Sequence, residues 1–383
     1  MKTSTDRILT THVGSLPRPR PLVDLLLARD RGEPYDAAEL TKMVSTSVDA
    51  IIARQVDLGI DVVSDGETSK AGYGTYIKER LSGFSQENYR SKMQSDFVEF
   101  PELYNKIMGT MGRTSLPLRL CCTAPIRVID DKAVQIDITN FKAALKKTPA
   151  QDAFMNAVSP GTVAHFQPNR HYKTMADYFE ALALAMRPEY EAIVAAGFVL
   201  QIDSPDLAMS HHSTFQDLSV EDFLKQAELA VEALNHALTN IPASSVRMHI
   251  CWGNYEGPHH HDLPLETILP IVLKAKVQAL SFEGSNPRHA HEWKVWADPK
   301  VPSDKILIPG MLDTSTNFIE HPELVAQRIE QYASVVGRER VIAGTDCGFA
   351  TFAGLGKIDP GVAFKKLESL VEGAEIASRR LWS

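Results

Sequence analysis

The chain alternates short apolar runs with longer amphipathic segments from end to end, and this alternation restricts its fold more than any other feature. Apolar runs bounded by turn-forming residues predict strands, here over residues 7–11, 61–64, 117–122, 199–202, 246–251, 279–282, 306–310 and 340–343. Helical periodicity predicts helices over residues 36–58, 175–195, 220–238, 265–274, 322–336 and 360–375. Two of these helices are predicted to begin at a proline, Pro322 after His321 and Pro360 after Asp359.

Strands that alternate with helices form βα units, and such units build a parallel sheet. Roughly eight of them predict an α/β fold of the (β/α)₈ TIM-barrel type, with insertions after the early strands at residues 70–113 and 130–173. We expect a single domain over residues 1–383, because no Gly-, Ser- or Pro-rich linker divides the chain. The alternative is a doubly wound open sheet, but the glycine-rich phosphate turn typical of that fold does not occur here.

The composition excludes several classes of protein. The 40 Lys and Arg residues against 48 Asp and Glu residues give a formal net charge of −8, which argues against nucleic acid or a membrane surface as a partner. No apolar run has the length of a membrane span, and the N-terminus lacks the apolar core of a secretory signal. We therefore expect a cytoplasmic protein whose 4 cysteines are reduced. The sequence leaves the oligomeric state open.

Four residues with metal-binding side chains follow late strands of the predicted barrel. His249 and Cys251 are two positions apart on one strand, so both side chains leave the same face. Glu283 follows the next strand and Cys347 follows the last one. Because parallel strands all end at one face of a barrel, we expect these groups to converge there. One imidazole, two thiolates and a carboxylate form a set suited to Zn²⁺. A lone His or Cys on a strand is more typical of a core, but a carboxylate such as Glu283 seldom lies in a core without a partner.

Acidic residues follow two other predicted strands. Asp65 and Glu67 come after the second strand, and Asp203 ends the strand that begins at Val199. Each could cap the helix that follows. Together they could instead form a negatively charged pocket that binds an ammonium group beside the metal.

Six short segments match a known family pattern in the same order: His12-Val13-Gly14-Ser15-Leu16-Pro17, Ser64-Asp65-Gly66-Glu67, Gln201-Ile202-Asp203, His249-Ile250-Cys251, Phe282-Glu283-Gly284-Ser285 and Thr345-Asp346-Cys347-Gly348. Their order and positions match jointly, which is a more specific signal than any single motif. Together they resemble the cobalamin-independent methionine synthase family, and the resemblance to its catalytic C-terminal barrel covers essentially the full length of the chain.

The resemblance implies a function and a site. It implies zinc-dependent methyl transfer to a thiol such as homocysteine, with a methylated folate or another compound as the donor. The implied zinc ligands are His249, Cys251, Glu283 and Cys347. The implied pocket for the thiol substrate contains Gly14, Ser15, Glu67 and Asp203, and we add His12 to it, with a structural role for His12 as the alternative.

The sequence departs from the family pattern at two places. The Asp-Glu-Pro motif of the family reads Asp203-Ser204-Pro205, so one carboxylate is missing. The segment in which the family carries an Asp and then a catalytic His contains Asp313 and Ser315, and we assign these two as the catalytic positions. Two alternative functions follow: an epoxide:coenzyme M-type thiol transferase, and a catalytically silent thiol-binding paralogue.

Several other residues admit two interpretations. His259, His260 and His261 resemble metal ligands by composition, but a solvated loop is favoured. Arg288 or His289 could bind a substrate anion or belong to a surface loop, and Trp252 could stack on a flat donor or pack in the core. The adjacent residues Cys121 and Cys122 are expected in the core, because neighbouring residues of a strand face opposite ways.

Overall fold

The computed structural model describes residues 1–87, 92–298, 300–355 and 358–383 except for 112–119, and within them eight parallel strands form a closed ring. Six strands pair in one continuous sheet, in the order β2 (Val62–Val63), β5 (Asp152–Val158), β6 (Val199–Asp203), β7 (Val246–Ile250), β8 (Ala279–Phe282) and β9 (Ile306–Pro309). The remaining two, β1 (Leu9–Thr10) and β10 (Ile342–Ala343), pair with each other. Parallel bridges from Thr11 to Val62 and from Leu307 to Val341 close the ring, which confirms the predicted barrel.

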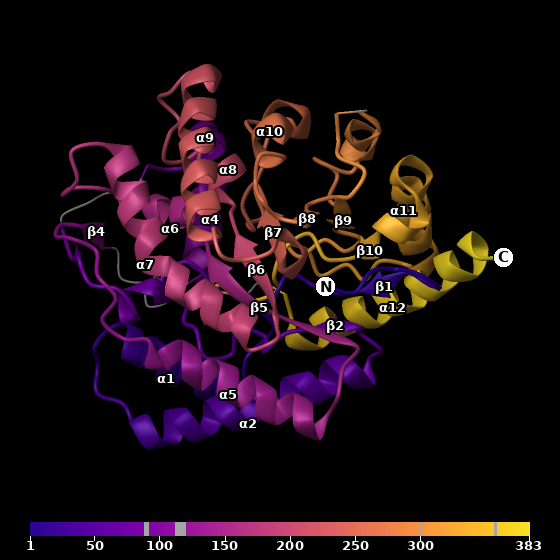
Figure 1. Ribbon diagram of the computed structural model, residues 1–383, viewed down its shortest axis with the longest axis horizontal. Helices are drawn as coiled ribbons and strands as arrows, with labels where there is room; N and C mark the ends of the chain where they lie inside the picture. The colour runs from indigo at the N-terminus through magenta and orange to yellow at the C-terminus, as the bar shows by residue number, and fades with distance from the viewer. Residues whose placement is uncertain (88–91, 112–119, 299, 356–357) are drawn as a thin grey trace.

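Helices surround this ring (Figure 1). Helices α1 (Arg20–Asp30), α2 (Ala37–Asp57) and α5 (Lys132–Lys147) lie together on one side, and α11 (Pro322–Val336) packs beside α12 (Pro360–Leu381). The other helices that follow barrel strands are α6 (Pro160–Phe166), α7 (Met175–Ala195), α8 (Asp206–Met209), α9 (Val220–Ala237) and α10 (Leu265–Val272). Short 3₁₀ turns are η1 (Tyr76–Glu79), η3 (Ala243–Ser245), η4 (Glu292–Ala297) and η5 (Arg338–Arg340). No helix of the described residues is long and apolar enough to cross a bilayer.

The local sequence explains where several helices begin. Both helices predicted to start at a proline do so, and in each the preceding side chain accepts a backbone hydrogen bond: His321 from Glu323 and Asp359 from Gly361. Thr174 and Asp177 cap each other at the start of α7, which begins and ends where the periodicity predicted. These caps satisfy backbone N–H groups that a helix leaves without partners in its first turn.

The third strand of the ring is not the predicted one. Of the predicted strand 117–122, residues 117–119 lie outside the described part of the chain, and Cys121–Cys122 form β4, which pairs antiparallel with β3 (Phe84–Ser85) and not with the ring. The third strand is β5, inside the stretch 130–173 that was predicted to be an irregular insertion. Asn156 interrupts its apolar pattern, and this polar residue has a partner at the candidate site. The insertion after β2 also carries α3 (Ser95–Glu99) and α4 (Pro101–Met111).

A buried cation crosses the interior of the barrel. The guanidinium of Arg247 on β7 donates to the Gln201 Oε1 atom at 2.6 Å, to the Thr11 Oγ1 atom at 3.0 Å and to the His12 carbonyl at 2.6 Å. Its central carbon lies 3.4 Å from the centroid of the Phe154 ring. Because β1 and β7 stand on opposite sides of the ring, this side chain ties them together. Burial lowers the pKa of Arg247 to about 9.

We expect Arg247→Met to lower the free energy of unfolding by about 2–4 kcal/mol, because three buried acceptors lose their donor while the side chain stays similar in volume. Urea unfolding followed by circular dichroism measures this. The matched control is Arg340→Met, because the half-buried Arg340 also donates to backbone carbonyls but lies at the surface. An equal loss in both variants would contradict a special role for the buried guanidinium.

Candidate metal centre

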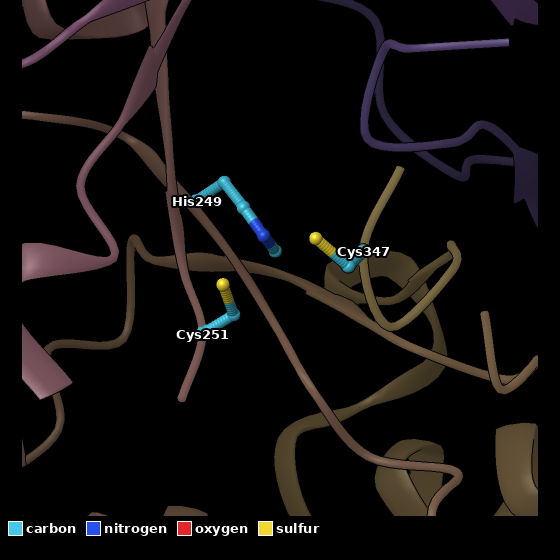
Figure 2. Close-up of side chains that lie close together, drawn as sticks. All are labelled: His249, Cys251 and Cys347. Atoms are coloured by element: carbon cyan, nitrogen blue, oxygen red, sulfur yellow. The ribbon is translucent and has the colours of Figure 1, made fainter. Parts of the chain in front are cut away.

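The ends of β7 and β10 place one imidazole and two thiols together. His249 is the fourth residue of β7, Cys251 follows its last residue on the same face, and Cys347 lies in the loop after β10. A ring nitrogen of His249 and the two Sγ atoms all lie within 4.8 Å of one another. Figure 2 shows the three side chains pointing toward one another. All three are at most 6 % exposed, so the group is shielded from solvent.

The two thiols of this group differ in their pKa. The pKa of the Cys251 thiol is lowered to about 6, because Cys347 donates a hydrogen bond to its sulfur and His249 stabilises the thiolate. The pKa of the Cys347 thiol is raised by the same contact and by burial. Burial opposes the charged imidazole, yet the pKa of His249 is raised because Cys251 and the carboxylates of Asp203 and Glu283 lie near it.

The donor atoms of this group fit a divalent metal ion. The Nε2 atom of His249 is buried and has no hydrogen-bond partner among the described residues, while its Nδ1 atom lies 3.3 Å from the Ser281 Oγ atom. An unpartnered nitrogen beside two convergent sulfurs is the donor set of a zinc site, and a hydrogen bond on the other ring nitrogen orients such a ligand.

Glu283, the fourth predicted ligand, lies outside the group of three. Its Oε1 atom accepts a hydrogen bond from the Trp252 amide at 2.8 Å. Its Oε2 atom accepts a hydrogen bond from the Asn286 side-chain Nδ2 atom at 2.6 Å and from the Arg288 guanidinium at 2.5 Å. Arg288, considered above for a substrate anion, therefore pairs with this carboxylate. Glu283 still lies close enough to act electrostatically on both thiols.

Asp346 holds the loops of the site together, and the sequence reasoning gave it no role. Its Oδ1 atom accepts hydrogen bonds from the amides of Gly284 and Ser285, at 2.8 and 2.9 Å. Its Oδ2 atom accepts from the Ser285 hydroxyl and from the amide and side chain of Asn286, at 2.8–2.9 Å. Asp346 thereby ties the loop that carries Glu283 to the neighbouring residue Cys347. The only sequence signal was its place inside a matching motif.

The first loop of the predicted thiol pocket is tightly constrained. The His12 Nε2 atom lies 2.7 Å from the Gln55 Oε1 atom, and its Nδ1 atom accepts from the Gly14 amide at 3.1 Å. Burial lowers the pKa of His12 to about 4, so the ring is neutral. Its contacts with Gln55 and Gly14 are structural. Gly14 has φ +142°, and a Cβ atom there would lie 2.4 Å from the Asn156 side chain. The Ser15 carbonyl accepts from the Phe349 amide at 2.9 Å, which joins this loop to the Cys347 loop.

Two buried carboxylates lie at the same end of the barrel. Asp203 accepts hydrogen bonds from two side-chain amides, that of Asn156 at 2.9 Å and that of Gln201 at 2.7 Å. Since Arg247 occupies the Gln201 oxygen, the Gln201 nitrogen faces Asp203. Within the part of the chain that the structure describes, the Oε2 atom of Glu67 is buried without a hydrogen-bond partner. Burial raises the pKa of Glu67 to about 7, with Lys70 opposing the shift and Asp203 adding to it.

The predicted catalytic residues Asp313 and Ser315 form a turn. The Asp313 Oδ1 atom accepts from the Ser315 amide and hydroxyl, both at 2.8 Å, and its Oδ2 atom accepts from the Thr316 hydroxyl at 2.7 Å. Burial opposes ionisation, but these bonds keep the pKa of Asp313 below its ordinary value. Asn254 links this turn to the Cys347 loop, because it bonds to the Thr314 hydroxyl at 3.1 Å and donates to the Gly348 carbonyl at 2.8 Å.

The loop between β7 and α10 is held by a carboxylate among histidines. Asp262 lies 3.0 Å from the His259 Nδ1 atom and 3.2 Å from the His289 Nε2 atom and the His212 Nδ1 atom. His289 also lies 2.8 Å from Glu292 and stacks on Trp252, so Trp252 packs in the core. Of the three loop histidines, His259 is buried, which the sequence reasoning did not expect, and the other two are exposed as predicted.

A family model described as "Cobalamin-independent synthase, Catalytic domain" matches residues 8–375. The chain belongs to this family. The cobalamin-independent synthase family comprises enzymes, and the predicted assignment is therefore confirmed.

Curated relatives and solved structures agree with this membership. A methionine synthase of Saccharolobus islandicus (strain Y.N.15.51 / Yellowstone #2) is 26% identical over 375 residues, covering 97% of this chain and 95% of that protein. A methionine synthase of Sulfolobus acidocaldarius is 24% identical over 97% of this chain and 93% of its own length. The B12-independent methionine synthase from Shewanella sp. W3-18-1, in complex with selenomethionine, has a TM-score of 0.76 at 20% identity, over 98% of this chain and 99% of that one. At this identity the structure supports the fold alone.

The Asp262 histidine network predicts a pH dependence of stability for this synthase-family chain. Burial opposes the charged form of His289, but Asp262 and Glu292 raise its pKa to about 9. A raised pKa in the folded state contributes stability that is present below about pH 6.5 and is lost as the pH rises through about 9. We expect the unfolding free energies of wild type and His289→Gln to differ by about 3 kcal/mol more at pH 6.5 than at pH 9.5.

Urea unfolding of both proteins at the two pH values measures that difference. The exposed His236, which also pairs with a carboxylate, provides the control His236→Gln. A difference between wild type and His289→Gln that does not change with pH would show that His289 is not charged in the folded protein.

Proposed function

We propose that this chain transfers a methyl group to the sulfur of homocysteine, forming methionine, and that Zn²⁺ is its metal. One observation carries the proposal: a buried imidazole nitrogen without a partner and two thiols converge at the end of the barrel where parallel strands end. Family membership and the names of the curated relatives support it. We further propose that residues 1–383 form one domain around this site.

His249, Cys251 and Cys347 would hold the metal, and Glu283 is the proposed fourth donor. When bound, zinc supplies the ionisation of the substrate thiol, because a free thiol with a pKa of about 8.5 is mostly protonated at neutral pH. When Glu283 is not a ligand, the other three protein ligands would leave room for a substrate atom, as in catalytic zinc sites. The Arg288 contact gives Glu283 an alternative partner whenever it is not a ligand.

Glu67 and Asp203 are the proposed site for the ammonium group of the substrate. Both carboxylates are buried at the end of the barrel that carries His249, and one oxygen of Glu67 has no hydrogen-bond partner. An ammonium group offers three donors and a positive charge, which would lower the pKa of Glu67 from about 7 and keep it ionised. The Gly14-Ser15 turn, oriented by His12, would hold the carboxylate end of the same substrate.

The reaction itself needs orientation more than further chemistry. The thiolate sulfur attacks the methyl carbon in line, the S–C bond forms, and the bond from carbon to the donor breaks with its electron pair leaving on the donor. We propose a methylated folate as the donor, whose nitrogen then takes up a proton. Asp313 and Ser315 are the proposed catalytic pair: the Ser315 hydroxyl, which donates to Asp313 in the structure, would rotate to donate its hydrogen bond to the departing group. Holding the reactants in line accounts for most of the acceleration.

We expect Cys251→Ser and Cys347→Ser to lose zinc and to methylate homocysteine more than about 1,000-fold more slowly, because a hydroxyl is a far poorer ligand than a thiolate. Zinc content by atomic absorption and methionine formation measure the two effects. Cys121→Ser, a buried cysteine of β4 outside the ring, is the control and should retain both. Full zinc content together with full activity in Cys251→Ser would end the proposal.

We expect Glu67→Gln and Asp203→Asn to raise the KM for homocysteine by about 10- to 100-fold, since each loses a charge-assisted hydrogen bond to the ammonium group. With 4-mercaptobutanoate, which lacks that group, the same substitutions should change the KM little. Steady-state kinetics with both thiols and with coenzyme M measure this. Either of two results would contradict the assigned pocket and favour the epoxide:thiol alternative. One is a preference for coenzyme M over homocysteine, and the other is an equal increase in KM for homocysteine and for 4-mercaptobutanoate.

A further inference from the structure

A second group of metal-binding side chains lies at the surface, and two of its three residues belong to the loop that follows Cys251. It consists of Glu99, the last residue of α3, and His260 and His261 of the loop between β7 and α10, and we call it the outer cluster. One ligand atom from each residue lies within 4.8 Å of the others. The His260 Nε2 atom is 3.2 Å from the Glu99 Oε2 atom, and the His261 Nε2 atom contacts the Glu99 Oε1 atom.

The two segments that carry the outer cluster are already fixed against each other from beneath. Asp96 of α3 is 1 % exposed, and its Oδ2 atom accepts from the Tyr255 hydroxyl and the His259 amide, both at 3.0 Å. His259 has φ +55°, a left-handed conformation that is unusual for a residue with a side chain. Its ring is fixed between Asp262 and the Tyr255 carbonyl and stacks on the Tyr255 ring. The side chains of His260 and His261 therefore extend from a stretch of backbone whose position is fixed by buried contacts.

The donor geometry suits a small divalent ion. Donor atoms of a tetrahedral zinc site, each about 2.0–2.1 Å from the metal, are roughly 3.3 Å apart, so side-chain rotations of this group suffice. Two imidazoles and one carboxylate suit Zn²⁺, Ni²⁺ or Cu²⁺, and water can complete the coordination because the three side chains are 41–51% exposed. The His260 ring also packs on His261 and Phe100, which restricts both imidazoles.

We propose that Glu99, His260 and His261 bind a second divalent metal ion, of the zinc class, that clamps the insertion after β2 to the loop following Cys251. The site differs from the first in having no sulfur donor, so it binds more weakly and exchanges faster. Metal binding through the two Nε2 atoms requires the tautomer in which each neutral ring carries its proton on Nδ1. This proposal does not rest on the methyl-transfer function, and either could fail alone.

The test is a Zn²⁺ titration of the full, tag-free chain after metal removal, followed by calorimetry at pH 7.5. We expect wild type to bind about two equivalents of Zn²⁺, one tightly and one more weakly. The double variant His260→Ala with His261→Ala should lose the weaker equivalent and keep the tighter one. Cys251→Ser with Cys347→Ser should abolish the tighter one and keep the weaker. Glu99→Gln should weaken the second equivalent about tenfold or more, because the neutral amide is a poor ligand.

His236→Ala is the matched control. His236 pairs with Glu180, and the exposed fractions of the two side chains equal those of the His260–Glu99 pair, but no second imidazole of the described residues forms a metal-binding group with them. This variant should keep both equivalents. The proposal is overturned if the variant without His260 and His261 binds as many equivalents of Zn²⁺ as wild type. Circular dichroism of each variant verifies that it is folded.

Discussion

The site depends on one constraint, the closure of eight parallel strands into a ring. Closure rests on the pairing of β1 with β10 and on the parallel bridge from Thr11 to Val62. Because all strands of the ring run the same way, every strand ends on the same rim. Groups more than three hundred residues apart in the sequence, such as the Ser15 carbonyl and the Phe349 amide, thereby come within hydrogen-bond distance.

Buried polar side chains hold this rim in shape. Asp346 accepts hydrogen bonds from the loop after β8, and Arg247 spans the barrel below and orients Gln201 toward Asp203. Burying such groups is unfavourable unless each has partners, and these have several. At the mouth, by contrast, the Nε2 atom of His249 and the Oε2 atom of Glu67 have no partner among the described residues. Buried polar groups without partners are suited to bind something from outside.

The loop after Cys251 is held from three directions, which gives it a defined position at the rim. Glu283 accepts from the amide of Trp252, Asp262 binds His259 and His289 in the middle of the loop, and Asp96 reaches it from the insertion. The insertion is therefore part of the structure that positions a proposed metal ligand. The outer cluster joins the same two segments at the surface.

Alternating periodicity was enough to predict the barrel and most of its elements, because a parallel strand buried on both faces is a short apolar run. It failed at β5, where Asn156 serves the site instead of the core, and at the predicted strand 117–122, whose described residues Cys121–Cys122 pair antiparallel with β3 outside the ring. Motif order identified the three residues that converge, His249, Cys251 and Cys347. It did not single out Asp346, Asn156 or Arg247, because nothing local distinguishes a buried partner from any other polar residue.

The sequence by itself determined the fold class, the family and the donor types of the candidate metal centre, since these follow from periodicity, from the joint order of motifs and from residue identity at strand ends. Only the tertiary structure decided that Glu283 is held by Arg288 and Trp252, that Asp313 and Ser315 bond to each other, and that His260 and His261 face Glu99. The physical reason is that a side chain's partner is chosen by distance in space. That distance is set by loop conformations and by contacts between segments far apart in the chain.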